Sequence, residues 1–184
     1  MSISTAGDFE QRLLRLEARQ MLTELVSRYA VATDDRDYAA IEGMFTPDAT
    51  FGAQCGWPAI LAFFHDRHGV FGPTYHYVHA HHFDFESNDI ARGVINTHAE
   101  IAIDGKNVWM AIRYLDRYVR QNDRWYFTDR QQKLRYAMPF EELADAYATP
   151  LRKRIPGTAP AAAELPETLP TWIAAMAKRT AGRA

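Results

Sequence analysis

The order of two hydrophobic patterns along the chain constrains its fold more than any other feature. In the N-terminal part, apolar residues such as Leu22, Leu25 and Tyr29 recur at helical spacing. Further on, the residue pattern predicts long strands at 75–86, 91–104, 109–120 and 124–136. Helices followed by strands with short hairpin turns indicate the α+β class. We therefore predict a cone-shaped barrel, in which a curved antiparallel sheet wraps around the N-terminal helices.

The first part of the chain should contain helices at 8–32, 38–45 and 58–68 and a short strand at 49–53. Asp8 and Asp37 are suitable N-caps for the first two helices. Thr46-Pro47-Asp48 is expected to end the second helix as a turn, and Gly69 to stop the third. Gly72-Pro73 is expected as a further break before the strands begin.

One predicted strand shows which side of the sheet is buried. Because side chains alternate along a strand, its residues fall into two sets, an apolar one and a polar one. The apolar set, expected to face the helices and a pocket, is Ile95, Thr97, Ala99, Ile101 and Ile103. The polar set on the opposite face is Asn96, His98 and Glu100.

Chain length and a change in composition predict one domain with a tail. With 184 residues the chain is too short for two ordinary domains and a linker. The domain is expected at 1–138 and a C-terminal extension at 139–184. Within the extension we expect a helix within 139–154, a Pro/Ala-rich segment at 155–170 and an amphipathic stretch at 171–178. A packing role on the same or a neighbouring subunit is expected for it.

Charge and cysteine content exclude several classes of function. The net charge of −2 gives no positive field for phosphates or anionic lipid, so we expect no nucleic-acid partner. Cys55 is the only cysteine, which excludes disulfide frameworks and multi-cysteine metal sites. No segment has the apolar length of a membrane span or the pattern of a secretory signal. A soluble protein of the cytoplasm is expected.

The densest cluster of polar chemistry is a run of histidines. Four of the seven histidines, His76, His79, His81 and His82, open the first long strand. Alternation places His79 and His81 on one face and His76 and His82 on the other, unless a bulge resets the register. A site of two histidines and one carboxylate for iron is one reading. No spacing marks a third ligand, so we predict no metal, and surface or subunit contacts are the simpler interpretation of these histidines.

A second candidate group lies where the first helix ends. Tyr29 closes its apolar face, and Asp34 follows about one and a half turns later, so both can point into the mouth of a cone. The simpler interpretations are that Tyr29 is a core residue and that Asp34 or Asp35 caps the bend. The chain contains no glycine-rich phosphate loop, serine-hydrolase elbow or zinc-protease helix.

These segments carry a resemblance to a known family. The stretch from Ser27 to Tyr38, the segment 44–51 and Thr74-x-His76 resemble the SnoaL-like, nuclear transport factor 2-like superfamily, over about residues 12–136. That superfamily includes polyketide cyclases, scytalone dehydratase, bile-acid dehydratase and hexachlorocyclohexane dehydrochlorinase. The resemblance implies a lyase or isomerase with a pocket for a small apolar molecule.

The resemblance also implies roles for individual residues. An Asp-His dyad falls on Asp34 and His76, and a tyrosine near the reacting group falls on Tyr29. A second histidine falls on His79, and a pocket-lining arginine falls on Arg130. Further substrate contacts are expected from Thr97, Ala99, Phe51 and Trp57. An asparagine that often follows the dyad histidine is Ala80 here, which removes one polar contact.

The chemistry that follows is proton abstraction without a cofactor. A neutral imidazole at position 76 could take a proton from carbon, with Asp34 fixing its tautomer, and Tyr29 or Arg130 could stabilise negative charge on oxygen. We predict a dehydratase-like or cyclase-like lyase, or an isomerase, acting on an apolar cyclic or polyketide-like compound. The alternative is a non-catalytic ligand-binding or subunit-pairing protein of the same fold. An apolar stripe on the outer sheet face predicts a homodimer or homotrimer.

Overall fold

The structure is a computed structural model and describes residues 6–181. Its elements are, in chain order, α1 (Ala6–Asp34), α2 (Tyr38–Glu42), β1 (Phe45–Phe51), β2 (Gln54–Cys55), α3 (Trp57–Val70), β3 (Phe71–Phe85), β4 (Ile90–Ile103), β5 (Lys106–Gln121), β6 (Arg124–Pro139), the short 3-10 helix η1 (Phe140–Glu142), α4 (Leu143–Ala146) and α5 (Pro170–Ala181). Helices come first and the long strands follow, so the predicted α+β class is confirmed.

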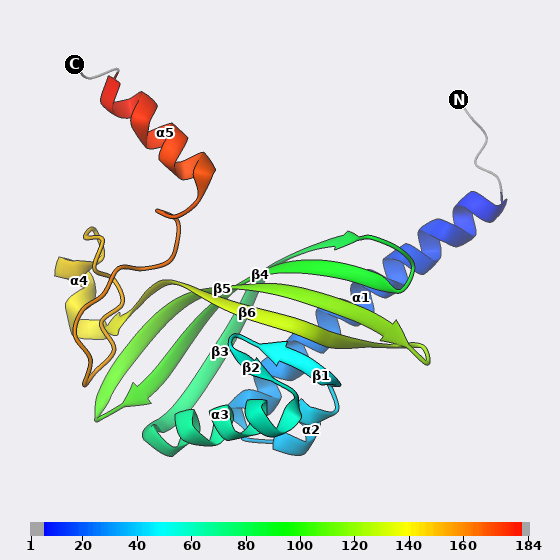
Figure 1. The fold of residues 1–184 in the computed structure, drawn as a ribbon, viewed down its shortest axis with the longest axis horizontal. Helices are drawn as coiled ribbons and strands as arrows, with labels where there is room; N and C mark the ends of the chain where they lie inside the picture. Colours follow the sequence, from blue (N-terminus) through cyan, green and yellow to red (C-terminus); the bar gives the residue numbers. More distant parts are fainter. Residues whose placement is uncertain (1–5, 182–184) are drawn as a thin grey trace.

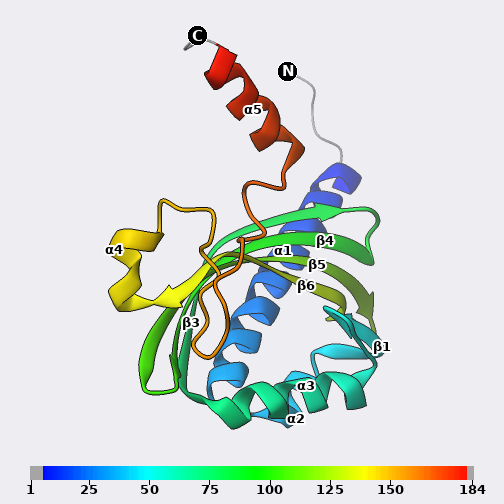
Figure 2. The same cartoon turned by 60° about the vertical axis from the view of Figure 1, so that its left-hand side comes forward.

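The strands form one mixed sheet with the order β2-β1-β6-β5-β4-β3. The long strands β3 to β6 pair antiparallel, as the hairpin turns predict, while β1 lies parallel to β6. The sheet is therefore curved but not closed into a barrel. Helix α1 runs along one face of the sheet, and α2 and α3 lie on that same side, which completes the cone (Figures 1 and 2).

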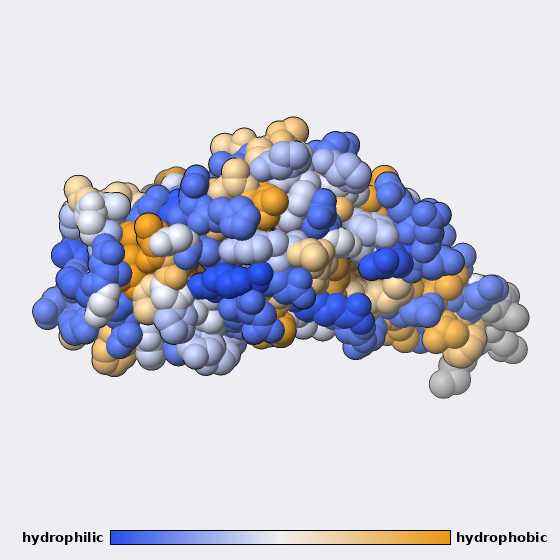
Figure 3. Space-filling view, turned by 90° about the horizontal axis from the view of Figure 1, so that it is seen from below, coloured by the Kyte–Doolittle hydropathy of each residue, from blue (hydrophilic) through white to orange (hydrophobic). Residues whose placement is uncertain are grey.

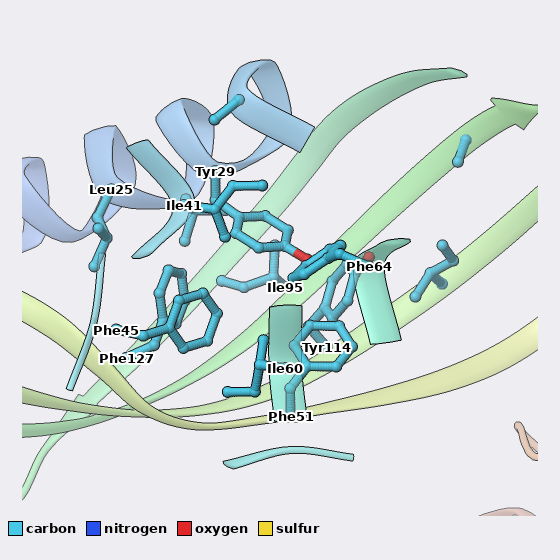
Figure 4. Close-up of a cluster of buried hydrophobic side chains, with 14 of the residues drawn as sticks. Leu25, Tyr29, Ile41, Phe45, Phe51, Ile60, Phe64, Ile95, Tyr114 and Phe127 are labelled. Atoms are coloured by element: carbon cyan, nitrogen blue, oxygen red, sulfur yellow. The ribbon is translucent and has the colours of Figure 1, made fainter. Parts of the chain in front are cut away.

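The core lies between α1 and the concave face of the sheet. Leu22, Val26 and Tyr29 form the buried face of α1, at the spacing that the sequence predicts. Along β4, the apolar set from Ile95 to Ile103 is buried, and the polar set on the other face is more exposed, so the predicted alternation is confirmed. Aromatic rings from α1, β1, α3, β5 and β6 fill the middle (Figure 4).

Several element boundaries differ from the sequence prediction. Helix α1 continues to Asp34, and α2 ends at Glu42. The segment Thr46-Pro47-Asp48 belongs to strand β1, because the pairing of β1 with β6 is irregular there and does not need the N–H that Pro47 lacks. Gly72-Pro73 likewise lies inside β3, where an edge strand with an irregular register tolerates proline.

The chain after β6 folds back along that strand. We call residues 150–169 the strap. Its anchor is the largely buried Arg152, which donates to the carbonyl oxygens of Arg135, Thr149 and Leu165 and to the Glu167 carboxylate. The strap ends at α5, which extends away from the sheet (Figures 1 and 2). The helix expected within 139–154 is present as η1 and α4.

The outer surface has mixed polarity. Viewed from the side of α3, it is mostly hydrophilic with scattered hydrophobic residues (Figure 3). Within residues 6–181, none of the helices is both long and apolar enough to cross a membrane.

A tight contact inside the sheet provides a test of this packing. A Cβ on Gly93 would lie 2.8 Å from the ring of Tyr118, which is buried and packs against Phe83 and Phe127. We expect Gly93→Ala to lower the free energy of unfolding by about 1–3 kcal/mol, because the ring has no space to move into. Gly69→Ala in α3, where a Cβ meets no atom within 4 Å, is the control and should be neutral or stabilising. Urea unfolding measures both, and an equal effect of the two changes would contradict the packing described.

Candidate active site in the cone

A cavity of about 190 Å³ lies between the helices and the concave face of the sheet. Its lining is Tyr29, Thr33, Phe51, Phe63, Phe64, Arg67, His68, Phe71, Thr74, His76, Ile101, Met110, Ile112, Tyr114, Gln132, Leu134, Lys153, Ile155 and Glu164. The buried members are mostly aromatic or aliphatic, and the charged members Arg67, Lys153 and Glu164 are more accessible. A lining of this kind suits a small molecule with an apolar body.

The shortest polar contact at this cavity joins Asp34 to His76. The Nδ1 atom of His76 lies 2.7 Å from Oδ1 of Asp34, and the backbone N–H of His76 donates to Oδ2 at 2.8 Å. The hydroxyl of Thr74 donates to Oδ1 at 2.9 Å. One carboxylate at the end of α1 is thus hydrogen-bonded to two residues of β3, and the two side chains are largely buried.

These contacts determine how the carboxylate and the imidazole share protons. Burial alone would raise the pKa of Asp34, but the hydrogen bonds from the ring and backbone of His76, the attraction to that ring and the bond from Thr74 outweigh it and lower the pKa. An ionised carboxylate only accepts hydrogen bonds, so Nδ1 of His76 must carry the proton. In the neutral ring, Nε2 then holds the free lone pair, on the side of the ring that faces away from Asp34.

Arg36 holds the end of α1 against β3. Its guanidinium donates to the carbonyl oxygens of Thr33, Asp34 and Gly72 and to the hydroxyl of Thr74. The residue itself has a positive φ of 61° at the bend after α1. Because these bonds satisfy the last carbonyls of the helix, the bend that carries Asp34 has a defined position.

Tyr29 and Tyr114 meet at the inner end of the cavity. Their rings are 6.4 Å apart and nearly perpendicular, and Figure 4 shows the Tyr29 hydroxyl directed toward Phe64 and Tyr114. Burial raises the pKa of Tyr29, so its hydroxyl stays protonated and can donate a hydrogen bond.

Comparisons with known proteins agree with this architecture. The SnoaL-like domain matches residues 14–131 of the chain, which is more than half of its length. The chain belongs to the SnoaL-like domain family. None of the curated proteins compared is significantly similar to it in sequence.

Solved structures share the fold of this SnoaL-like chain. The dehydrochlorinase LinA-type3 from Novosphingobium barchaimii is 20% identical with a TM-score of 0.66, covering 76% of this chain and 99% of that one. A candidate scytalone dehydratase from Novosphingobium aromaticivorans is 15% identical, with a TM-score of 0.65 and coverages of 79% and 97%. An NTF2-like protein with a cystatin-like fold from the same organism is 20% identical, with a TM-score of 0.61 and coverages of 73% and 92%. Identities this low show the fold alone.

Of the other residues expected to contact a substrate in this SnoaL-like domain, some line the cavity and others do not. Phe51 lines the cavity, but Trp57 packs on Phe45, and Thr97 and Ala99 are buried on the inner face of the sheet without being among the lining residues. Alternation along β4 correctly gives the face of Thr97 and Ala99, but face alone does not say which side chains of that face reach the cavity. These three residues are therefore core residues and not lining residues.

Arg130 is also placed behind the lining. Its guanidinium lies 4.1 Å from the ring centre of Tyr29 and 3.9 Å from that of Tyr114, and Nε is 3.6 Å from Asp116 Oδ1. Burial raises the pKa of Asp116 to about 6 despite the opposing effect of Arg130. Because the two tyrosine rings separate Arg130 from the cavity, it supports them from behind and does not reach a molecule inside.

A bulge in β3 corrects the expected distribution of the histidines. The pairing with β4 shifts between Val78 and Ala80, so His79 is the extra residue. His76 and His81 pair with Ala99 and Ile95 of the inner face, while His79 lies over the outer face, 6.4 Å ring to ring from His98. The exposed His82 lies 3.2 Å from Asp84. His79 and His81 therefore do not share a face, and His79 does not line the cavity.

Across residues 6–181, no set of three or more His, Cys, Asp or Glu side chains is arranged to hold a metal.

His68 lines the cavity although the sequence analysis does not single it out. It comes from the last turns of α3, and its Nδ1 lies 3.0 Å from the hydroxyl of Tyr38. Burial, then the charges of Arg36, His76 and His65, lower the pKa of His68 to about 4, against a weaker opposing effect of Asp34. The sequence feature that could have pointed to His68 as a site residue is its position three residues after His65, on the helix that precedes the histidine run.

The low pKa of His68 has a consequence for stability. In the unfolded chain the ring binds a proton near pH 6.5, but in the folded chain only near pH 4, so stability is lost as the pH falls through this window. We expect His68→Gln to lose less stability than the wild type between pH 7 and pH 4.5 in urea unfolding. His82→Gln, at an exposed position, is the control. Equal losses in the wild type and His68→Gln would show that burial does not keep His68 neutral.

Proposed function

We propose that this SnoaL-like chain is a cofactor-independent lyase or isomerase that removes a proton from carbon in a small apolar cyclic or polyketide-like compound. The observation that carries the proposal is the hydrogen bond between Asp34 and His76 Nδ1 beside an apolar cavity. It gives the imidazole a fixed tautomer with the lone pair of Nε2 available as a base.

The proposed elimination is balanced within the substrate. Nε2 of His76 takes the proton from the carbon next to a carbonyl group. The electron pair of that C–H bond forms a carbon–carbon double bond as the bond to a neighbouring hydroxyl breaks. The imidazolium then returns the proton to the departing oxygen, which leaves as water. In an isomerisation, the same proton returns to another carbon of the substrate.

Three residues support this reaction without exchanging protons. The ionised Asp34 stabilises the imidazolium that forms on His76. The Tyr29 hydroxyl donates a hydrogen bond to the carbonyl or departing oxygen, and Arg130, behind the Tyr29 ring, positions it. His79, Thr97, Ala99 and Trp57 have no contact role in this account.

The alternative of a protein that only binds a ligand predicts a different arrangement. Such a protein does not need a histidine oriented by a carboxylate, and divergent side chains at positions 34 and 76 would favour it. The 2.7 Å contact between them supports an enzyme instead.

Proton abstraction is testable before the natural substrate is known. We expect the wild type to catalyse exchange of α-hydrogens for deuterium in a panel of cyclic hydroxy-ketones in D₂O, followed by NMR. His76→Ala and Asp34→Asn should lose about 10²–10⁴-fold in rate, the usual contribution of general-base catalysis, because the first lacks the base and the second favours the wrong tautomer. Asp34→Asn should bind the same ketones as the wild type does.

His82→Ala is the matched control, because it removes an exposed histidine of the same strand. It should exchange at the wild-type rate. If Asp34→Asn keeps the full rate on any compound that the wild type exchanges, the proposed mechanism is wrong.

We also propose that the protein is a homodimer or homotrimer in solution. The outer face of the sheet exposes apolar side chains, including Tyr75, Tyr77 and Leu115, that another copy would cover. Light scattering at micromolar concentration should return a mass of two or three chains. A stable monomer would contradict this proposal. The proposed function includes no cofactor and no nucleic-acid partner.

A further inference from the structure

We propose that the strap selects substrates that carry a carboxylate, with Lys153 as the residue that binds it. The inference rests on the proposed function, because it assigns the charge of the substrate at the same cavity. It concerns residues that lie outside the part of the chain matched by the SnoaL-like domain, which ends at residue 131.

The cavity has an apolar inner part and a charged rim. Tyr29, Phe51, Phe64 and Tyr114 are buried, whereas the charged lining residues are more accessible: Arg67 is exposed, and Lys153 and Glu164 are half-buried. The apolar body of a ligand therefore fits inside, and its polar group meets the rim. In the proposed reaction, the reacting carbon then lies beside His76, and the charged group lies at the strap.

The rim has more positive than negative charge. Within the described chain, no carboxylate lies within ion-pair distance of Lys153 or Arg67. The guanidinium of Arg67 lies over the ring of Phe63, at 5.2 Å from its centre. Glu164 already accepts the backbone N–H of Leu134 through Oε2. Arg67 packs on an aromatic ring, whereas no ion pair, hydrogen bond or ring contact engages the Lys153 side chain within residues 6–181, so Lys153 favours an anionic group over a neutral or cationic one.

The backbone of the strap holds Lys153 in place. Lys153 exchanges two hydrogen bonds with Ala161 across the strap, and it forms a bridge with Ala137 at the end of β6. Its neighbour Arg152 is the buried anchor, with bonds to three carbonyl groups and to Glu167. The backbone position of Lys153 beside the cavity thus follows from an ordered strap and not from a free loop.

Lys153 is partly exposed, so its effect on binding is moderate and salt-dependent. One charge-assisted hydrogen bond of this kind gives about tenfold in affinity, and the gain falls as salt screens the charges. Lysine binds as a point charge, so Lys153→Arg should keep the preference for an anion.

The test compares two probes of equal shape, cyclohexanecarboxylate and cyclohexanecarboxamide, by isothermal titration calorimetry. The wild type should bind the carboxylate about tenfold more tightly than the amide, and 1 M salt should reduce this preference. Lys153→Met should abolish the preference while leaving the affinity for the amide unchanged, and Lys153→Arg should restore it.

Lys133→Met is the matched control. It removes the same charge from β6, where Lys133 pairs with Arg113 and does not line the cavity. It should keep the wild-type preference. Equal affinity of the wild type for the two probes, or a preference that survives in Lys153→Met, would overturn the inference.

The outcome is independent of catalysis, because the probes bind without reacting. Measuring both the carboxylate preference and the deuterium exchange of the wild type separates the two proposals. A carboxylate preference in a protein without deuterium exchange refutes the proposed function and leaves the role of Lys153 intact. Dyad-dependent exchange without a carboxylate preference refutes the role of Lys153 alone.

Discussion

The contact on which the rest of the site depends is the one between a carboxylate at the end of a helix and the backbone of a strand. Asp34 accepts hydrogen bonds from the Thr74 hydroxyl, the His76 backbone and the His76 ring, so the end of α1 and the start of β3 are held together. Arg36 strengthens the same junction from the other side of the bend. The junction that orients the imidazole is thus also one that attaches the helix to the sheet.

The aromatic core and the cavity follow from this junction. With α1 held along the concave face, Tyr29 meets Tyr114 and Phe64, and the space left beyond them is the inner part of the cavity. A charged group deep in such a core would be costly without partners. Arg130 is tolerated because the rings of Tyr29, Tyr114 and Phe127 and the carboxylate of Asp116 surround it.

Features that depend on local periodicity could be predicted from the sequence. The burial alternation of β4 and the order of helices before strands follow from residue pattern, and the Asp34–His76 pair follows from a family resemblance to short motifs. The bulge after Val78 could not be predicted, because one extra residue in a strand leaves no pattern of its own while changing the face of every later side chain.

Features that depend on long-range packing also escaped prediction. Arg130 and Thr97 are buried but do not line the cavity, and only the three-dimensional packing around the cavity decides this. The strap has the composition of a linker, yet Arg152 fixes it and brings Lys153 to the rim. His68 enters the site through the packing of α3 on the cone. None of these positions is encoded by neighbouring residues.

The central claim, that Asp34 fixes the proton of His76 on Nδ1 and leaves Nε2 as the base, is tested most directly by ¹⁵N NMR of histidine-labelled protein. In the neutral form of the ring, the account predicts an Nδ1–H tautomer whose proton resonates downfield through its bond to Asp34, and loss of this signal in Asp34→Asn. Assigning the signal to His76 requires its absence in His76→Ala. An Nε2–H tautomer at His76 in the wild type would contradict the account.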